Sequence, residues 1–131
     1  MYNDNSFIAK IPPIKGRFVA LDTETTGLSY KNQDHTISLA GVEIVNGRIT
    51  GAQFMGYLQP RTKINFRACQ IHGLKQDFYT KYFDETYMND YAVLKKFREF
   101  IGDDLVFAHN ARFDYNFLNK DFKHFGLPLI K

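Results

Sequence analysis

The chain has 131 residues, a length that fits one domain, and 44% of them are apolar, which is enough for a modest core. Its net charge of +3 is compatible with a nucleic-acid partner but does not indicate one. A single cysteine, Cys69, excludes an intrachain disulfide and a cysteine-based zinc site. The sequence shows neither a long apolar run nor a signal-peptide pattern, so we expect a cytoplasmic protein with no membrane association.

Residues 1–16 are interpreted as a lead-in segment and residues 17–131 as the folded domain. The lead-in contains Pro12-Pro13, which disfavours both helix and central strand. Residues 18–21 are apolar and predict a short strand buried on both faces. Residues 37–45 and 48–58 are then expected to pair as a hairpin around Asn46-Gly47, because a type I′ turn needs positive φ at both central positions.

The second half of the domain alternates between helix and strand. Residues 64–74 predict a short helix or turn that ends at Gly73, and residues 75–89 predict a loop with at most one helical turn. Asp90 is the expected cap of a helix that stops at Gly102, and residues 105–108 predict a second short buried strand. Asn110 is expected to cap a last helix. The apolar stripes of the two helices comprise Leu94, Phe97 and Ile101, and then Phe113, Phe117, Leu118 and Phe122. This order predicts an α/β domain with a mixed sheet.

Two carboxylates follow the first predicted strand. Asp22 and Glu24 are two positions apart, so they point to the same side of a strand and repel each other. A divalent cation such as Mg²⁺ or Mn²⁺ would compensate that charge with hard oxygen ligands. The alternative is a solvated acidic turn, which is the commoner explanation of a bare Asp-x-Glu.

A third carboxylate follows the second predicted strand. Asp114 lies in the first turns of the last predicted helix, near the positive end of its dipole. If the two strands are neighbours, Asp114 faces Asp22 and Glu24 at one edge of the sheet. The alternative is that Asp114 only complements the helix dipole.

Both segments resemble motifs of the DnaQ-like (DEDD) 3′→5′ exonuclease family, which includes the proofreading exonucleases of bacterial DNA polymerase III. Residues 18–28, with the sequence FVALDTETTGL, resemble the first exonuclease motif, and residues 109–118, which begin HNARFD, resemble the second. Residues 41–49 resemble the hairpin of the family and residues 71–74 its Ile-His-Gly segment. The resemblance covers roughly residues 17–128.

The resemblance implies an RNase H-like fold, a mixed β-sheet with flanking helices. It implies that Asp22, Glu24 and Asp114 are the catalytic metal ligands of a site for two Mg²⁺ or Mn²⁺ ions. It also implies contact with the terminal nucleotide by Thr23, Thr25, Gly27, Leu28, His72, Asn110 and Phe113. A structural role in closing a turn is equally open for His72.

The sequence departs from the family pattern after Asp114. The third motif of the family, His-x4-Asp or Tyr-x3-Asp, supplies a general base and a fourth carboxylate, and no such spacing follows Asp114. The last strand and helices of the fold are also expected to be missing. Two earlier His-x4-Asp spacings, at His72 and at His109, lie within or beside other motifs. We therefore expect weak or absent hydrolysis from this chain alone, because general-base catalysis contributes about 10²–10⁴-fold.

The sequence thus predicts a 3′→5′ exonuclease domain that hydrolyses frayed or single-stranded DNA 3′ ends, in replication proofreading or repair, with a DNA polymerase subunit as a partner. Three alternatives stay open: a nucleic-acid-binding remnant without catalysis, an RNA-trimming exonuclease, and an interaction module whose carboxylates are only solvated.

Overall fold

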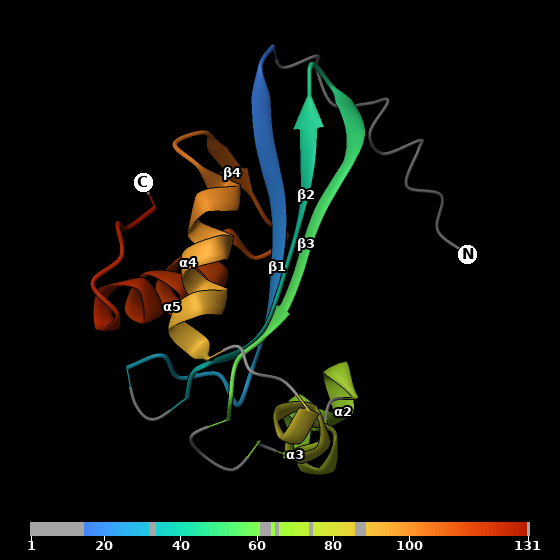
Figure 1. Cartoon of the computed structure of the whole chain (residues 1–131), viewed down its shortest axis with the longest axis vertical. Coiled ribbons are helices and arrows are strands. Elements are labelled where there is room, and N and C mark those ends of the chain that lie inside the picture. Colours follow the sequence, from blue (N-terminus) through green and yellow to red (C-terminus); the bar gives the residue numbers. More distant parts are fainter. Residues whose placement is uncertain are drawn as a thin grey trace.

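The computed structural model describes residues 15–31, 34–60, 64, 66–73, 75–85 and 89–130, and most of the predicted lead-in lies outside these ranges. The elements are β1 (Arg17–Thr25), β2 (Thr36–Val45), β3 (Arg48–Tyr57), α2 (Phe66–His72), α3 (Gln76–Glu85), α4 (Asp90–Ile101), β4 (Leu105–Phe107) and α5 (Ala111–His124). Helices α4 and α5 lie on one face of the sheet, while α2 and α3 lie beyond its lower end (Figure 1). None of the described helices is both long and apolar enough to cross a membrane.

The four strands form one mixed sheet in the order β3-β2-β1-β4. β1 pairs with β2 and β2 pairs with β3 in antiparallel fashion, whereas β4 runs parallel to β1. The predicted mixed sheet is therefore confirmed. Because β1 and β4 are parallel neighbours, the segments that follow them emerge at the same end of the sheet.

The hairpin turn is confirmed in its details. Asn46 and Gly47 have φ values of 50° and 80°, as a type I′ turn requires. The Asn46 side chain also accepts a hydrogen bond of 2.7 Å from the backbone N–H of Gly16. The turn thus fixes both the hairpin register and the start of β1.

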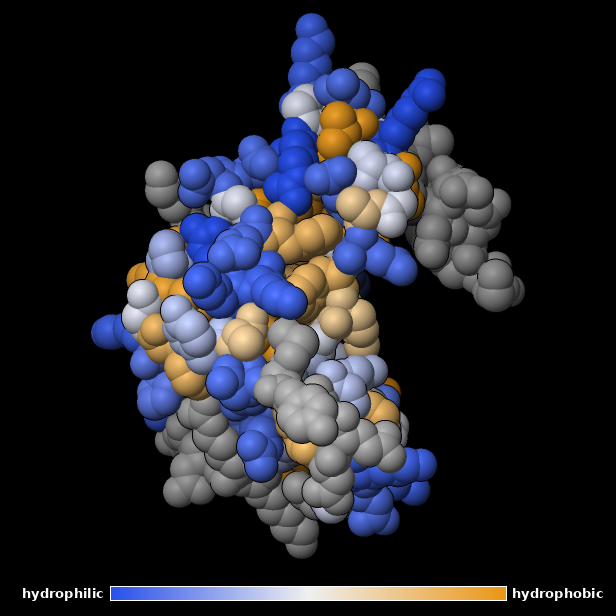
Figure 2. All heavy atoms as spheres, viewed as in Figure 1, coloured by the Kyte–Doolittle hydropathy of each residue, from blue (hydrophilic) through white to orange (hydrophobic). Residues whose placement is uncertain are grey.

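The core lies between the sheet and the helices α4 and α5. Alternate residues of β1, Val19 and Leu21, point into it, and the fully buried side chains include Leu39, Leu94, Phe97, Ile101, Leu118 and Phe122. The predicted helix stripes are thus confirmed, with Phe113 only half-buried. Some apolar residues also lie on the displayed face of the molecule, with polar residues around them (Figure 2).

The predicted strand within residues 105–108 is confirmed as β4, but the prediction that it is buried is wrong. Leu105 and Phe107 of β4 are 63% and 47% exposed. The reason is topological: within the described part of the chain β4 pairs with β1 alone, so it is an edge strand whose outward side chains meet no helix.

The prediction of a loop over residues 75–89 is also wrong, because α3 occupies Gln76–Glu85. Tyr79 is buried against Ile37 and Ile64, and its hydroxyl donates a 2.9 Å hydrogen bond to the Ile37 carbonyl. Phe78 and Tyr82 pack edge-to-face on Tyr57 of β3. Aromatic packing against β3 therefore stabilises α3.

The N-terminal cap of α4 differs from the prediction by one residue. Asn89, and not Asp90, accepts a 2.8 Å hydrogen bond from the backbone N–H of Ala92. Asp90 instead accepts from the backbone N–H of Gln59, which joins α4 to the end of β3. Gly102 follows the helix with a φ of 66°, as predicted.

Arg17 fastens the end of α4 to the sheet. Its guanidinium donates to the carbonyls of Phe100 and Ile101 and pairs with Glu43 and Asp104 at 2.6 and 2.9 Å. Unpaired carbonyls at a helix C-terminus attract cations, so this arrangement satisfies backbone groups and charge together.

Candidate functional site

The candidate site lies at the end of β1 where the strand leaves the core. Strand alternation places Thr23 and Thr25 on the buried side and Asp22 and Glu24 on the other. Asp22 is exposed and Glu24 is half-buried. The two carboxylates therefore share one face, as their spacing predicts.

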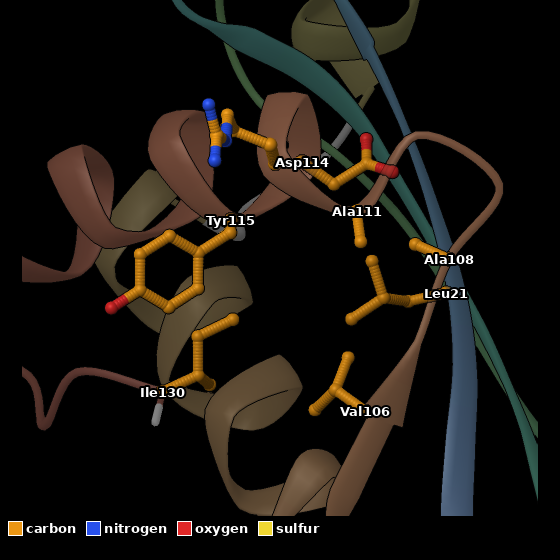
Figure 3. Close-up of a pocket in the computed structure, with 8 residues that line it drawn as sticks. Leu21, Val106, Ala108, Ala111, Asp114, Tyr115 and Ile130 are labelled. Carbon is orange, nitrogen blue, oxygen red and sulfur yellow. The ribbon is translucent and has the colours of Figure 1, made fainter.

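Asp114 approaches the same end of the sheet from α5. It lies one turn after Asn110, whose carbonyl accepts a 3.1 Å hydrogen bond from the Asp114 backbone N–H. Its side chain is only 4% exposed and points towards β1 (Figure 3). There the Thr23 hydroxyl donates a hydrogen bond to Asp114 Oδ1. Thr23 and Asp114 are 91 positions apart in sequence, and they meet because β4 pairs with β1 and leads into α5.

The electrostatics of the site disfavour full ionisation. Burial is the main cause that raises the pKa of Glu24, and the charges of Asp22 and Asp114 raise it further. Burial also raises the pKa of Asp114; the hydrogen bond from Thr23 opposes this, the Asp22 charge adds to it, and His109 lowers the pKa. At this end of the sheet the charges of Asp22 and Asp114 act on Glu24, and the charge of Asp22 also acts on Asp114.

An Asp114→Asn variant is expected to be more stable than the wild type at neutral pH in metal-free buffer. The folded-state pKa of Asp114 is raised, so its contribution to stability is present in acid and is lost as the pH rises above the ordinary aspartate value of 3.8. Asparagine keeps an acceptor for Thr23 without the charge. We expect a gain of roughly 1 kcal/mol, a few degrees in Tm.

Thermal unfolding in EDTA at several pH values checks this prediction. The difference between the variant and the wild type should be smallest in acid and should open towards neutral pH. A variant that is less stable than the wild type at neutral pH would mean that the Asp114 charge has a favourable partner.

The loop after β1 is closed by its own hydrogen bonds. The Thr25 hydroxyl donates to the Gly27 carbonyl at 2.5 Å, and His72 Nε2 lies 3.2 Å from the Thr25 carbonyl oxygen. Thr25 and Gly27 are buried, whereas Leu28 is 80% exposed. Leu28 is therefore the apolar side chain that this loop presents to solvent.

The other predicted substrate residues fall into two groups. Asn110 is exposed and its side chain makes no capping hydrogen bond, while Phe113 is half-buried and packs on Phe117 with ring centroids 4.7 Å apart. Thr23, in contrast, is buried and its hydroxyl is engaged by Asp114. The substrate contact predicted for Thr23 stays a prediction, and its hydroxyl is occupied by the hydrogen bond to Asp114.

The three carboxylates fit a divalent cation by type and charge. Carboxylate oxygens are the ligands that Mg²⁺ and Mn²⁺ prefer, and the repulsion that raises the pKa of Glu24 is the kind that a cation relieves. Within the described ranges no group of three His, Cys, Asp or Glu side chains lies close enough together to hold a metal ion, and Asp114 accepts a hydrogen bond from Thr23 instead. The three residues thus supply carboxylate oxygens that suit a divalent cation. The hydrogen bond from Thr23 of β1 holds the Asp114 carboxylate near that strand.

An apolar cavity of about 280 Å³ adjoins Asp114 between β4, α5 and the C-terminal segment. Its lining residues include Leu21, Val106, Tyr115 and Ile130, whose side chains surround the open space in Figure 3. Asp114 thus lies at one margin of a mostly apolar cavity.

Two features of the site are not predicted by the motifs. Tyr79 of α3 lies close enough for the Glu24 charge to contribute to a raised pKa of its hydroxyl, after burial and Tyr57. Asp34 binds the loop that follows β1. The sequence offers one indication of Asp34, because it is an acidic residue shortly before the second strand.

Comparison with known proteins identifies the family. Residues 19–130 match the family model of the RNase T-type exonucleases. DNA polymerase III subunit epsilon of Buchnera aphidicola is 37% identical over 111 residues, which cover 81% of this chain and 45% of that protein. The PolC-type DNA polymerase III of Listeria innocua is 37% identical over 114 residues, which cover 87% of this chain and 7% of that protein.

Solved structures agree on the fold. A product-bound structure of exonuclease I superposes with a TM-score of 0.71 at 17% identity, over 87% of this chain and 27% of that one. A metal-free complex of Escherichia coli exonuclease I with single-stranded DNA also gives 0.71 at 17% identity, over 86% and 25%. The chain belongs to the RNase T-type exonuclease family and has its RNase H-like fold. It spans about half the length of the epsilon subunits that it matches.

Proposed function

We propose that this chain is the nucleolytic part of a 3′→5′ exonuclease that acts on DNA 3′ ends. The observation that carries the proposal is the arrangement of Asp22, Glu24 and Asp114. They come from two motifs far apart in sequence and lie at one end of the sheet, where burial and then the charges of Asp22 and Asp114 raise the pKa of Glu24. The similarity to polymerase III epsilon subunits supports a role in replication proofreading or repair.

Asp22, Glu24 and Asp114 would hold Mg²⁺ or Mn²⁺. Such ions, when bound, stabilise the charge that develops on the attacking and leaving oxygens of phosphodiester hydrolysis. Water adds its oxygen to the last phosphorus, and the bond to the 3′ oxygen of the preceding nucleotide breaks. The products are a nucleoside 5′-monophosphate and a strand with a new 3′-hydroxyl.

Neighbouring residues of the protein orient the carboxylates of the site and the terminal nucleotide. The Thr23 hydroxyl keeps Asp114 turned towards β1, and His72 holds the carbonyl at the end of that strand. We assign contact with the terminal nucleotide to Leu28, Asn110 and Phe113, because an apolar side chain and an aromatic ring can pack against a base of any sequence. The backbone of Thr23, Thr25 and Gly27 would lie beside the same nucleotide.

The partners follow from the relatives and remain part of the proposal. Subunits of DNA polymerase III match the chain, and a DNA-bound exonuclease I has the same fold. We therefore assign a single-stranded or frayed 3′ end as substrate, a DNA polymerase as partner and the cytoplasm as location.

A polarity assay tests the proposed function. The purified chain, in excess over a 5′-labelled single strand and in Mn²⁺, is expected to produce a slow ladder of products shortened one nucleotide at a time. A circular strand, which has no 3′ end, should stay intact. Internal cuts in the circle would contradict exonuclease action, and faster shortening of an RNA strand of the same sequence would favour the RNA-trimming alternative.

A second candidate is a binding remnant that has lost catalysis. It is favoured by the engagement of Asp114 with the Thr23 hydroxyl, and by the described ranges containing no group of three acidic or histidine side chains placed to hold a metal ion. A folded sample that binds the labelled strand in Mn²⁺ without shortening it, even after long incubation, would support this candidate over the nuclease.

A further inference from the structure

Asp34, which lies just before β2, binds the loop that follows β1 through both carboxylate oxygens. Its Oδ1 accepts a 3.0 Å hydrogen bond from the Thr26 hydroxyl, and its Oδ2 accepts a 3.1 Å hydrogen bond from the Ser29 backbone N–H. Hydrogen bonds to a charged acceptor are stronger than neutral ones. One side chain thus spans the loop from residue 26 to residue 29.

The same carboxylate explains the glycine at position 27. A Cβ atom built on Gly27 would lie 2.6 Å from Asp34 Cγ, which is closer than real Cβ contacts come. The φ angle of Gly27 is not in the positive range, so backbone conformation does not demand glycine there. Gly27 is therefore required because Asp34 packs against its Cα.

Asp34 is itself held from two directions. Lys120 of α5 donates a 2.8 Å hydrogen bond to the Asp34 carbonyl. The next residue, His35, exchanges backbone contacts with Thr26: its carbonyl accepts from the Thr26 N–H at 3.0 Å, and its own N–H donates to the Thr26 hydroxyl at 3.2 Å. The carboxylate is thus a fixed point and not the end of a free side chain.

The result is a rigid loop that presents one apolar side chain. Thr26 and Gly27 are buried, and Leu28, between the two ends fixed by Asp34, is 80% exposed. An exposed leucine on a well-anchored loop loses little conformational freedom when a ligand covers it, which favours binding.

We propose that Asp34 is a positioning residue that holds residues 26–29 so that Leu28 is ready to pack against the 3′-terminal nucleotide. This inference rests on the proposed function. Among the described residues, the hydrogen bonds of Asp34 go to Thr26, Ser29 and Lys120 and not to the three carboxylates of the site. Its loss should therefore weaken the capture of 3′ ends and leave the chemical step largely intact.

Variants at Asp34 test the proposal with two measurements. In Asp34→Ala the Ser29 amide should exchange with solvent about tenfold faster or more, measured by NMR without substrate, because its acceptor is gone. In single-turnover hydrolysis the concentration of chain that half-saturates a labelled strand should rise about tenfold, with the rate at saturation within about threefold of wild type. Asp34→Asn keeps the shape of the side chain and one acceptor, so its values in both measurements should fall between those of the wild type and those of Asp34→Ala.

A double substitution tests the packing against Gly27. Gly27→Ala should speed Ser29 exchange on its own and should have little further effect in the Asp34→Ala background, because the collision partner is then absent. Asp103→Ala is the matched control, since the Asp103 side chain is 98% exposed. It should leave both measurements unchanged.

The outcomes separate the two proposals. Unchanged half-saturation in Asp34→Ala, in a sample whose wild type binds and shortens the strand, would overturn the positioning role. If the wild type neither binds nor shortens the strand, the proposed function fails and the positioning role fails with it, while faster Ser29 exchange still identifies the anchor. Should Asp34→Ala not fold, a wild-type half-saturation in Asp34→Asn together with Ser29 exchange equal to wild type would overturn the inference.

Discussion

An Asp22→Asn chain is expected to shorten a 5′-labelled single strand on the order of 10³-fold more slowly than the wild type in Mn²⁺. Asp22 is exposed at the end of β1 and shares a face with Glu24, so the substitution removes a charged donor without disturbing the core. The measurement is single-turnover hydrolysis with protein in excess, so that even slow shortening accumulates.

The matched control is Asp103→Asn, which removes the same charge from a side chain that is 98% exposed. Asp103 precedes β4 and lies at the end of the sheet opposite to Asp22, because Leu105 pairs with Phe18 at the start of β1. The control should keep the wild-type rate. If Asp22→Asn also kept it, the shortening would come from another site or from a contaminating nuclease.

Replacing Phe97 by alanine is expected to cost about 3–5 kcal/mol of unfolding free energy. Phe97 is fully buried in α4 and packs on Phe54 with ring centroids 5.0 Å apart. Domains have a total stability of about 5–15 kcal/mol, so this loss would leave a protein that is barely folded at 37 °C. Urea unfolding followed by circular dichroism measures it.

Tyr91→Ala is the control for the same helix, because Tyr91 is 44% exposed. It should cost well under half as much as Phe97→Ala. Equal costs for the two substitutions would mean that α4 does not pack on the sheet as described.

The hairpin and the buried face of α4 follow from patterns with a clear physical basis. Asn46-Gly47 specifies the hairpin turn through positive φ angles, and the stripe of Leu94, Phe97 and Ile101 specifies the buried face of α4. The prediction of a loop over residues 75–89 failed because α3 depends on aromatic contacts with Tyr57 of β3. Such contacts join segments that are distant in sequence, and local periodicity does not reveal them.

The exposure of β4 was unpredictable for a similar reason. Leu105 and Phe107 are as apolar as Val19 and Leu21 of β1, but burial depends on what covers a strand and not on the strand itself. An apolar run of four residues predicts a strand and leaves its position in the sheet open.

The candidate site was likewise predictable only in part. The spacing of Asp22 and Glu24, together with a second strand that leads to Asp114, predicted three carboxylates at one end of the sheet only if the two strands are neighbours, which the sequence left open. The hydrogen bond between Thr23 and Asp114 and the anchoring of the loop by Asp34 depend on side-chain packing between distant segments. Motif positions therefore indicate candidate residues for the chemistry, and the fold is needed to see which residues hold those candidates in place.

The measurement that tests the central claim most directly is Mn²⁺ binding by the folded chain, compared by calorimetry among the wild type, Asp22→Asn and Asp114→Asn. If the carboxylates of the two motifs form one metal site, each substitution should weaken binding about tenfold or more, and Asp103→Asn should not change it. Equal Mn²⁺ affinity in all four proteins would contradict the claim and would mean that Asp22 and Asp114 are merely solvated.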